Sequence, residues 1–332
     1  CIKKLGKGKS PGPDGVVSEL YMTATRTSDP ELKAQIETQP VCDLGRSLLG
    51  LAQMIWRTGK FPRCWDAAVI VSIPKKPGST KPGDYRGISL IQTISKLMTS
   101  ILAKRILKGL LQTDRLCKEQ AGFRSFEEGI AQATLVYELV TRAQESNKTS
   151  YITFIDAEKA FDRAPRGAII AKARAIGVRG RALQLIENLY QHASFKVRNG
   201  NYLSDIGAVE KGVKQGCPLS PILFCIFMND LNHAIQTNAP NLGHSLYPRG
   251  PQITAGKFAD DVAMIAADHQ TAIHQQKAVS EWMDTWKMKA NAIKEQAEAT
   301  EELMANFTEA HTRQIESLIK ANTEAMKEMM SL

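Results

Sequence analysis

Phe258-Ala259-Asp260-Asp261 places two adjacent carboxylates between two short apolar runs, 253–258 and 262–267, which together predict a hairpin. Upstream, the β-branched and aromatic run 151–155 predicts a strand that leads directly into Asp156. Adjacent carboxylates repel each other unless a cation or another partner lies between them. If the strand and the hairpin belong to one sheet, three carboxylates meet at one edge, and such hard oxygen ligands suit Mg²⁺. The alternative is an ordinary turn in which the paired aspartates make only local hydrogen bonds.

The elements around these carboxylates indicate a mixed fold. Apolar periodicity predicts helices over 43–58, 90–111, 127–144, 218–237 and, as two helices, 167–192. Further strands are predicted at 68–73 and over 195–213, where Asn199-Gly200-Asn201 forms a hairpin turn. Helices and strands do not alternate regularly, so we predict an α+β fold in which helices pack against an antiparallel sheet.

Composition narrows the class of protein. The chain has 332 residues, of which 43% are hydrophobic, and this share excludes wholesale disorder. No apolar run approaches the roughly 20 residues of a membrane helix, and the first residues lack a signal-peptide pattern. The six cysteines are scattered without a C-x-x-C pair, which is typical of reduced thiols. We therefore expect an intracellular protein, in the nucleus or the cytoplasm, without a membrane partner.

The charge is unevenly distributed along the chain. The net charge is +9, but the residues from position 290 onward hold four basic and eight acidic side chains. This segment is therefore −4, which leaves +13 on the first 289 residues. A basic body predicts a polyanionic partner, most commonly nucleic acid, although solubility alone is the alternative reading.

Several motifs resemble those of one polymerase family. FIDAEKAFD (154–162), KQGCPLSPILF (214–224) and FADD (258–261) resemble the three catalytic motifs of reverse transcriptases. The chain is similar in particular to the enzymes of non-LTR (LINE-type) retrotransposons through further boxes, namely 9–15, 73–75 with 84–90, and 120–124. The boxes follow the order of the family over about residues 6 to 294.

The resemblance implies a right-hand polymerase. Fingers elements would span 1–150 and the palm, with its antiparallel sheet, 151–294. No thumb is recognisable, so we expect a fragment truncated before the thumb. The residues 295–332 predict a long, acidic C-terminal helix with a weak coiled-coil seam, through which the chain would self-associate.

The resemblance also assigns metal ligands and an acid. Asp156, Asp260 and Asp261 would hold two Mg²⁺ ions, for which Mn²⁺ would also serve. Lys294 would protonate the departing pyrophosphate, and the alternative is a solvated helix lysine.

A second group of residues would bind the incoming nucleotide. Lys75 and Arg86 would hold its triphosphate. Phe161 would exclude a 2′-hydroxyl by its bulk, unless it is a core aromatic residue. Gln215 and Gly216 would line the nucleotide pocket, where glycine permits close backbone approach. We read the neighbouring Asp162 as a helix N-cap.

These assignments predict an RNA-directed DNA polymerase of a non-LTR retrotransposon. Its partners would be an RNA template, a DNA primer and deoxynucleoside triphosphates. One alternative is an inactive, truncated remnant that binds nucleic acid or oligomerises through its tail. An RNA-dependent RNA polymerase is a third reading, against which Phe161 argues because a ribonucleotide enzyme should not block the 2′-hydroxyl.

Overall fold

The computed structural model describes residues 1–25, 39–40, 42–123, 129–238, 243–245, 250 and 252–297. The chain forms two compact units that interleave along the sequence. The first unit comprises 1–117, 159–229 and 286–288, and the second comprises 118–158, 230–285 and the chain from 289 onward. The expected helical tail from 298, with its self-association seam, lies outside the described residues, as does Arg124.

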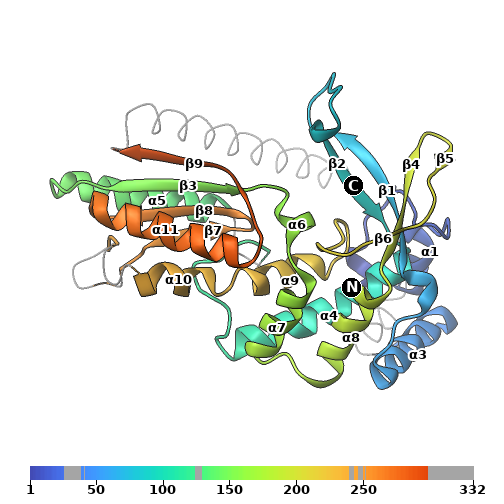
Figure 1. Cartoon of the computed structure of the whole chain (residues 1–332). Coiled ribbons are helices and arrows are strands. Elements are labelled where there is room, and N and C mark those ends of the chain that lie inside the picture. Colours follow the sequence, from blue (N-terminus) through green and yellow to red (C-terminus); the bar gives the residue numbers. More distant parts are fainter. Residues whose placement is uncertain are drawn as a thin grey trace, which may run out of the picture. The chain divides into compact units, whose positions relative to one another are not determined.

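The second unit is built on a four-stranded sheet. The strand order is β7–β8–β3–β9, and all neighbours pair antiparallel (Figure 1). The bounds are β3 (Tyr151–Ala157), β7 (Ala255–Phe258), β8 (Asp261–Ala266) and β9 (Ala290–Ala297). The predicted strand and hairpin therefore belong to one sheet. Strand β9 was not predicted, and it runs to residue 297, so the expected helix beginning at 295 is wrong for its first three residues.

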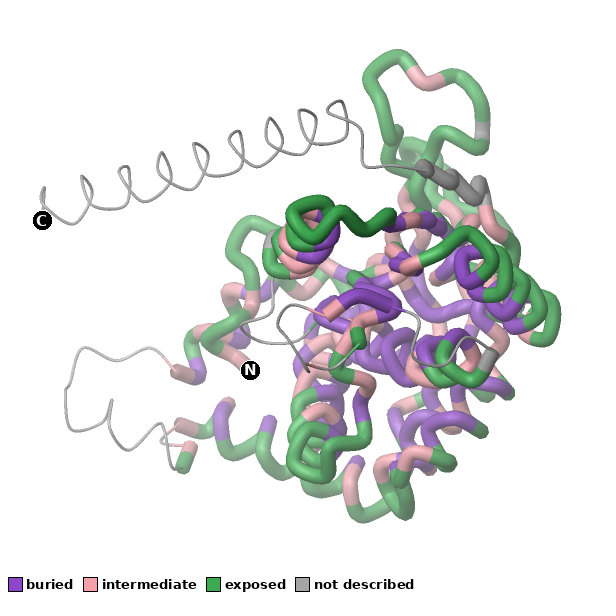
Figure 2. The backbone as a smooth tube through the Cα atoms, turned by 90° about the vertical axis from the view of Figure 1, so that its left-hand side faces the viewer, coloured by how far each residue is buried: buried purple, intermediate pink, exposed green. Residues whose placement is uncertain are grey.

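Helices of the second unit cover this sheet directly or pack against a helix that does. They are α5 (Gly129–Glu145), α10 (Leu231–Asn238) and α11 (His269–Thr285). Helix α11 contacts β3 and β8, α5 contacts β7, and α10 packs against α11. Buried Gln275 of α11 donates to the carbonyl of Ile265 in β8 at 3.1 Å. In β3, buried Ile155 lies between the exposed positions Phe154 and Asp156, so Asp156 lies on the open side of the strand. Figure 2 marks the buried stretches of the backbone in purple and the exposed ones in green.

The first unit contains a second sheet with the path β2–β1–β4–β5, and β6 pairs with β4. The bounds are β1 (Ala67–Pro74), β2 (Tyr85–Leu90), β4 (Ser194–Asn199), β5 (Tyr202–Leu203) and β6 (Gly207–Ala208). Strands β1 and β4 pair in parallel, whereas the other pairs are antiparallel. The expectation of a purely antiparallel arrangement thus holds only for the sheet of the second unit.

Helices make up most of the rest of the first unit. They are α1 (Ser18–Met22), α3 (Asp43–Thr58), α4 (Thr93–Gln112), α6 (Ala160–Arg163), α7 (Arg166–Ala175), α8 (Gly180–Gln191) and α9 (Ser220–Phe227). Short 3₁₀ turns, η1 to η4, lie at Ile2–Lys4, Thr23–Thr25, Arg63–Trp65 and Pro82–Asp84. Helix α9 is almost wholly buried, with Phe224 and Phe227 at 0% exposure, and forms the centre of this core.

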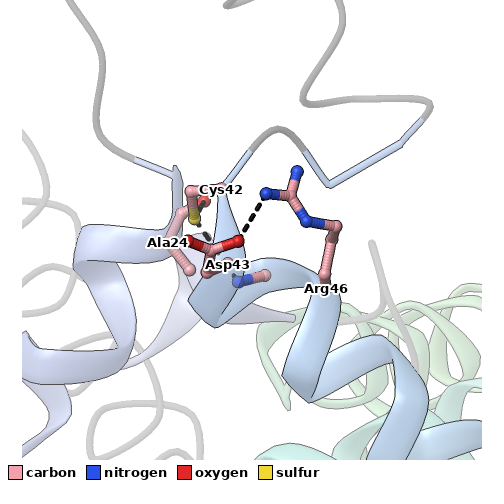
Figure 3. A network of polar contacts seen from close by, with 5 residues as sticks. Ala24, Cys42, Asp43 and Arg46 are labelled. Atoms are coloured by element: carbon pink, nitrogen blue, oxygen red, sulfur yellow. Dashed lines mark hydrogen bonds and ion pairs between the residues drawn. The ribbon is translucent and has the colours of Figure 1, made fainter.

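Helix α3 has the predicted bounds, and a cysteine caps it. The sulfur of Cys42 accepts from the Gly45 N–H at 3.3 Å, and its thiol donates to the Ala24 carbonyl (Figure 3). Asp43 lies in the first turn, where its negative charge suits the positive end of the helix dipole. It also forms an ion pair with Arg46 (Figure 3). None of the six cysteines, all of which lie within the described residues, forms a disulfide.

The single helix predicted over 218–237 is wrong. The structure forms α9 and α10 instead, separated at 228–230. Within this break the Asn229 side chain accepts from the Cys117 N–H at 2.7 Å and donates to the Arg115 carbonyl at 3.1 Å. These bonds tie Asn229 to a segment more than 100 residues away, so the helix does not continue through this position. Among the described residues, no helix is both long enough and apolar enough to cross a bilayer.

Candidate active site

The pairing of β3 with β8 brings the three predicted carboxylates together. Ile155 pairs with Val262, so Asp156 and Asp261 lie one residue beyond that pair on adjacent strands. Asp260 lies in the turn between β7 and β8. We call Asp156, Asp260 and Asp261 the carboxylate edge.

Electrostatics show that these carboxylates interact. The pKa of Asp261 is raised, first by partial loss of hydration, although the side chain remains accessible, and then by the negative charges of Asp260 and Asp156. A divalent cation relieves such repulsion, and carboxylate oxygens are the donors that Mg²⁺ prefers. Within the described residues, however, no group of three or more His, Cys, Asp or Glu side chains is arranged to hold an ion as it stands. The donor chemistry therefore fits a divalent cation, whereas a completed coordination shell is not formed.

The turn that presents the paired aspartates has a partner that the sequence did not reveal. Ala259 has a left-handed φ of 59°. Its N–H donates to Oε1 of Gln120 and its carbonyl accepts from Nε2 of the same side chain, both at 3.0 Å. Gln120 belongs to one of the motifs singled out in the sequence, but its contact with a residue 139 positions away had no local signal.

Lys294 lies beside the carboxylate edge in the sheet register. It pairs with Phe154, and Ala292 pairs with Asp156, before a bulge shifts the register at Ala157. The alternative reading placed Lys294 on a helix, and that placement is wrong because the residue belongs to β9.

A second group of predicted residues meets in the first unit. The Gln215 side chain donates from Nε2 to Oδ1 of Asp162 at 3.3 Å, and the Gln215 carbonyl accepts from the Ser89 N–H at 2.8 Å. Gly216 has a φ of 110°, and a Cβ there would lie 2.7 Å from the Ser89 carbonyl oxygen. We call Phe161, Asp162, Gln215 and Gly216 the Gln215 cluster.

Several side chains hold the loop that leads into this cluster. Arg166 donates to the carbonyl of Gly212 at 3.0 Å and also to that of Val209. Buried Lys214 donates from Nζ to the Asp66 carbonyl at 3.0 Å. The Val213 N–H donates to the Phe161 carbonyl at 2.8 Å. The loop is therefore fixed against α6 by bonds made from several elements of the same unit.

Phe161 and Asp162 lie in α6. The Phe161 ring stacks on buried Phe224 with centroids 4.6 Å apart, so one face of Phe161 is committed to the core. Burial raises the pKa of Asp162, while the charges of Lys159 and Lys75 oppose this effect. The N-cap role predicted for Asp162 is wrong, because Lys159 occupies the N-cap position of α6 and Pro165 that of α7. The Asp162 side chain instead accepts from Gln215.

Lys75 and Arg86 lie on the hairpin formed by β1 and β2. The Lys75 N–H donates to the Asp84 carbonyl at 2.8 Å, and its Nζ donates to that of Gly83 at 3.2 Å. Arg86 pairs with Ile73 across the hairpin. Lys75 is close enough to Asp162 to influence its pKa, so the first unit brings this lysine toward the Gln215 cluster.

Comparisons with known proteins agree on one family. The reverse transcriptase (RNA-dependent DNA polymerase) family matches residues 73–318. The chain is 28% identical over 305 residues to a protein described as a probable RNA-directed DNA polymerase from transposon BS of Drosophila melanogaster, covering 89% of this chain and 30% of that protein. It is also 28% identical over 249 residues to the RNA-directed DNA polymerase from mobile element jockey of Drosophila funebris, covering 72% and 26%. The chain thus spans about a third or less of these relatives.

A solved structure resembles the fold. Apo telomerase from Candida tropicalis, truncated from the C-terminal domain, matches with a TM-score of 0.54 and 14% identity. The match covers 72% of this chain and 51% of that one. At this identity the likeness concerns the polymerase fold alone.

Proposed function

Since this chain belongs to the reverse transcriptase family, we propose that it is the part of a non-LTR retrotransposon protein that copies RNA into DNA. The observation that carries the proposal is the convergence of three carboxylates at one edge of an antiparallel sheet. The substrates would be an RNA template, a DNA primer and deoxynucleoside triphosphates.

The proposed architecture is a right-hand polymerase. Fingers elements would lie within 1–150 and the palm within 151–294, followed by the tail at 295–332. The antiparallel sheet that bears the carboxylate edge supports the palm assignment, and the telomerase likeness supports a polymerase fold. Self-association through the tail stays a prediction.

The carboxylate edge would hold two Mg²⁺ ions, or Mn²⁺. When bound, such ions activate the attacking hydroxyl and neutralise the leaving pyrophosphate. The three aspartates would bind and position these ions, because a bound cation relieves the repulsion among their negative charges. Lys294, two positions along β9 from the partner of Asp156, would donate a proton to the departing pyrophosphate.

The Gln215 cluster and the β1–β2 hairpin would bind the nucleotide. Lys75 supplies a point charge and Arg86 a planar fork for phosphate oxygens. Phe161, braced on one face by Phe224, would present a rigid surface to the sugar and exclude a 2′-hydroxyl. Gln215 and Gly216 would form the wall of the pocket, with the Gln215 amide oriented by Asp162.

Primer extension on an RNA template tests this function. We expect the wild-type chain to incorporate deoxynucleotides in Mg²⁺ and to prefer them over ribonucleotides, because Phe161 blocks the 2′-hydroxyl. Asp260→Asn should abolish extension, because one metal-binding charge is lost. Asp284→Asn, which makes the same change on an exposed position of α11, is the matched control and should retain extension.

Two outcomes would contradict the proposal. One is equal extension by the wild type and Asp260→Asn. The other is no extension by the wild type across a range of metal and salt concentrations, which would favour a remnant that only binds nucleic acid.

A further inference from the structure

The turn before the paired aspartates adopts a conformation that its residue does not favour. Ala259 is not a glycine, yet its φ of 59° lies in the left-handed region. An L-residue is disfavoured in this conformation, because its Cβ comes too close to the following carbonyl oxygen. The direction in which the chain enters Asp260 and Asp261 depends on this dihedral, so the structure must hold it in place.

A single side chain satisfies both backbone groups of Ala259. Gln120 is 4% exposed, and its amide bonds to the N–H and the carbonyl of Ala259, each at 3.0 Å. Its Oε1 also accepts from the Gly122 N–H at 2.9 Å. Two backbone donors meet the amide oxygen and one backbone acceptor meets the amide nitrogen, so only one orientation of the side chain satisfies all three bonds.

The segment that carries Gln120 is anchored beside β7. The Lys257 N–H donates to the Glu119 carbonyl at 2.9 Å, and the Ala121 N–H donates to the Lys257 carbonyl at 3.0 Å. Gly122 lies so close that a Cβ there would be 2.3 Å from the Ala259 nitrogen. This parallel bridge and close approach place the Gln120 amide against the turn with little freedom to move.

We propose that Gln120 is a positioning residue, which locks Ala259 in its left-handed conformation and thereby sets where Asp260 and Asp261 lie relative to Asp156. This inference rests on the proposed function, because it assigns to the carboxylate edge the task of holding metal. It adds a residue that touches neither metal nor nucleotide and acts only through the backbone of the turn.

Substitution of Gln120→Met tests the lock, since methionine has a similar length but cannot make the three bonds. We expect kcat for incorporation to fall about 10- to 100-fold, as is typical when the groups behind metal ligands are removed. The KM for deoxynucleotide should stay unchanged, because no residue of the Gln215 cluster is altered. Titration of Mn²⁺, followed by electron paramagnetic resonance without nucleic acid, should show a similar loss of affinity.

A second substitution should partly restore the variant. Glycine adopts positive φ without the penalty of alanine. Ala259→Gly in the Gln120→Met background should therefore recover a substantial part of kcat and of Mn²⁺ affinity. The same change in the wild type should have little effect, because Gln120 already holds the turn.

The matched control is Gln275→Met. Gln275 is 1% exposed in the same unit and also donates to a backbone carbonyl, but it bonds to Ile265 rather than to the turn. We expect it to lower the melting temperature without lowering kcat or Mn²⁺ affinity. Gln120→Glu, which keeps the acceptor oxygen, replaces Gln120→Met if the latter does not fold, and should give a smaller loss of both quantities.

Three results would overturn the inference. They are wild-type kcat and Mn²⁺ affinity in the Gln120 variant, the same losses in Gln275→Met, and no recovery with Ala259→Gly. A wild-type chain without incorporation would overturn the proposed function instead, and the Mn²⁺ titrations would then still decide whether Gln120 shapes the carboxylate edge.

Discussion

The carboxylate edge and the Gln215 cluster are held in place by different means. The edge is the end of a regular ladder, in which strand pairing places Asp156 beside Asp261 and a buried amide fixes the turn before Asp260. The Gln215 cluster lies on a loop and a four-residue helix, where side chains bond to backbone carbonyls and a glycine permits close approach.

Because of this difference, we expect substitutions in the two regions to affect activity and stability differently. At the edge, like charges meet and oppose folding, so replacing an aspartate should remove activity without harming the fold. In the cluster, the backbone at Gly216 closely approaches the Ser89 carbonyl, so a larger side chain there should destabilise the fold as well as weaken nucleotide binding.

The largest expected effect follows from neutralising the edge. Asp156→Asn should lower kcat by about 10³-fold, since the loss of one metal ligand costs several kcal/mol of transition-state stabilisation. Its melting temperature without divalent cations should equal or exceed that of the wild type, because one repulsive charge is gone. Steady-state primer extension and thermal unfolding measure the two quantities. A large drop in melting temperature would break the contrast between the two regions.

A smaller effect, on stability, is expected from Gly216→Ala. The residue combines a φ of 110° with a position where a Cβ would lie 2.7 Å from a backbone oxygen, so we expect a loss of about 2–4 kcal/mol. Gly200→Ala is the control, since Gly200 has a φ of 59° but open space around it, and it should cost only about 1 kcal/mol. Urea unfolding would compare the two variants, and equal costs would show that close approach at Gly216 is unimportant.

The smallest effect concerns pH. Burial raises the folded-state pKa of Asp162, so the native chain binds this proton more tightly than the unfolded chain. The resulting stability is present below the unfolded pKa of about 4 and is lost as pH rises through the folded pKa. Asp162→Asn should therefore add less than about 1 kcal/mol at pH 7, a gain that disappears below about pH 4. Unfolding measured at both pH values checks the sign, and a gain that persists at low pH would contradict burial of the carboxylate as its cause.

The sequence predicted the elements whose signals are local. The β-branched run before Asp156 and the helix over 43–58 were both visible, because alternation and amphipathic periodicity act within a few residues. The three carboxylates were identified from their motifs. They could meet only if the strand and the hairpin shared one sheet, and in the structure β3 pairs with β8.

What was missed depends on long-range contacts. The stretch 290–297 is rich in alanine and would favour a helix, but pairing with β3 makes it a strand. The break at Asn229 has no glycine or proline, and its cause is a bond to residues more than 100 positions away. Gln120 and Asp162 were assigned no role or a local one, because their partners lie across the fold.

Single-turnover incorporation on an RNA template, measured against deoxynucleotide concentration, tests most directly whether the edge performs chemistry while the cluster binds nucleotide. Asp156→Asn should lower the maximal rate and leave the apparent Kd for nucleotide near the wild-type value. Asp162→Ala, which removes the oxygen that accepts from Gln215, should raise that Kd about three- to tenfold, the worth of one hydrogen bond that orients Gln215, and leave the maximal rate nearly unchanged. The opposite assignment, or equal changes of both constants in both variants, would contradict the account.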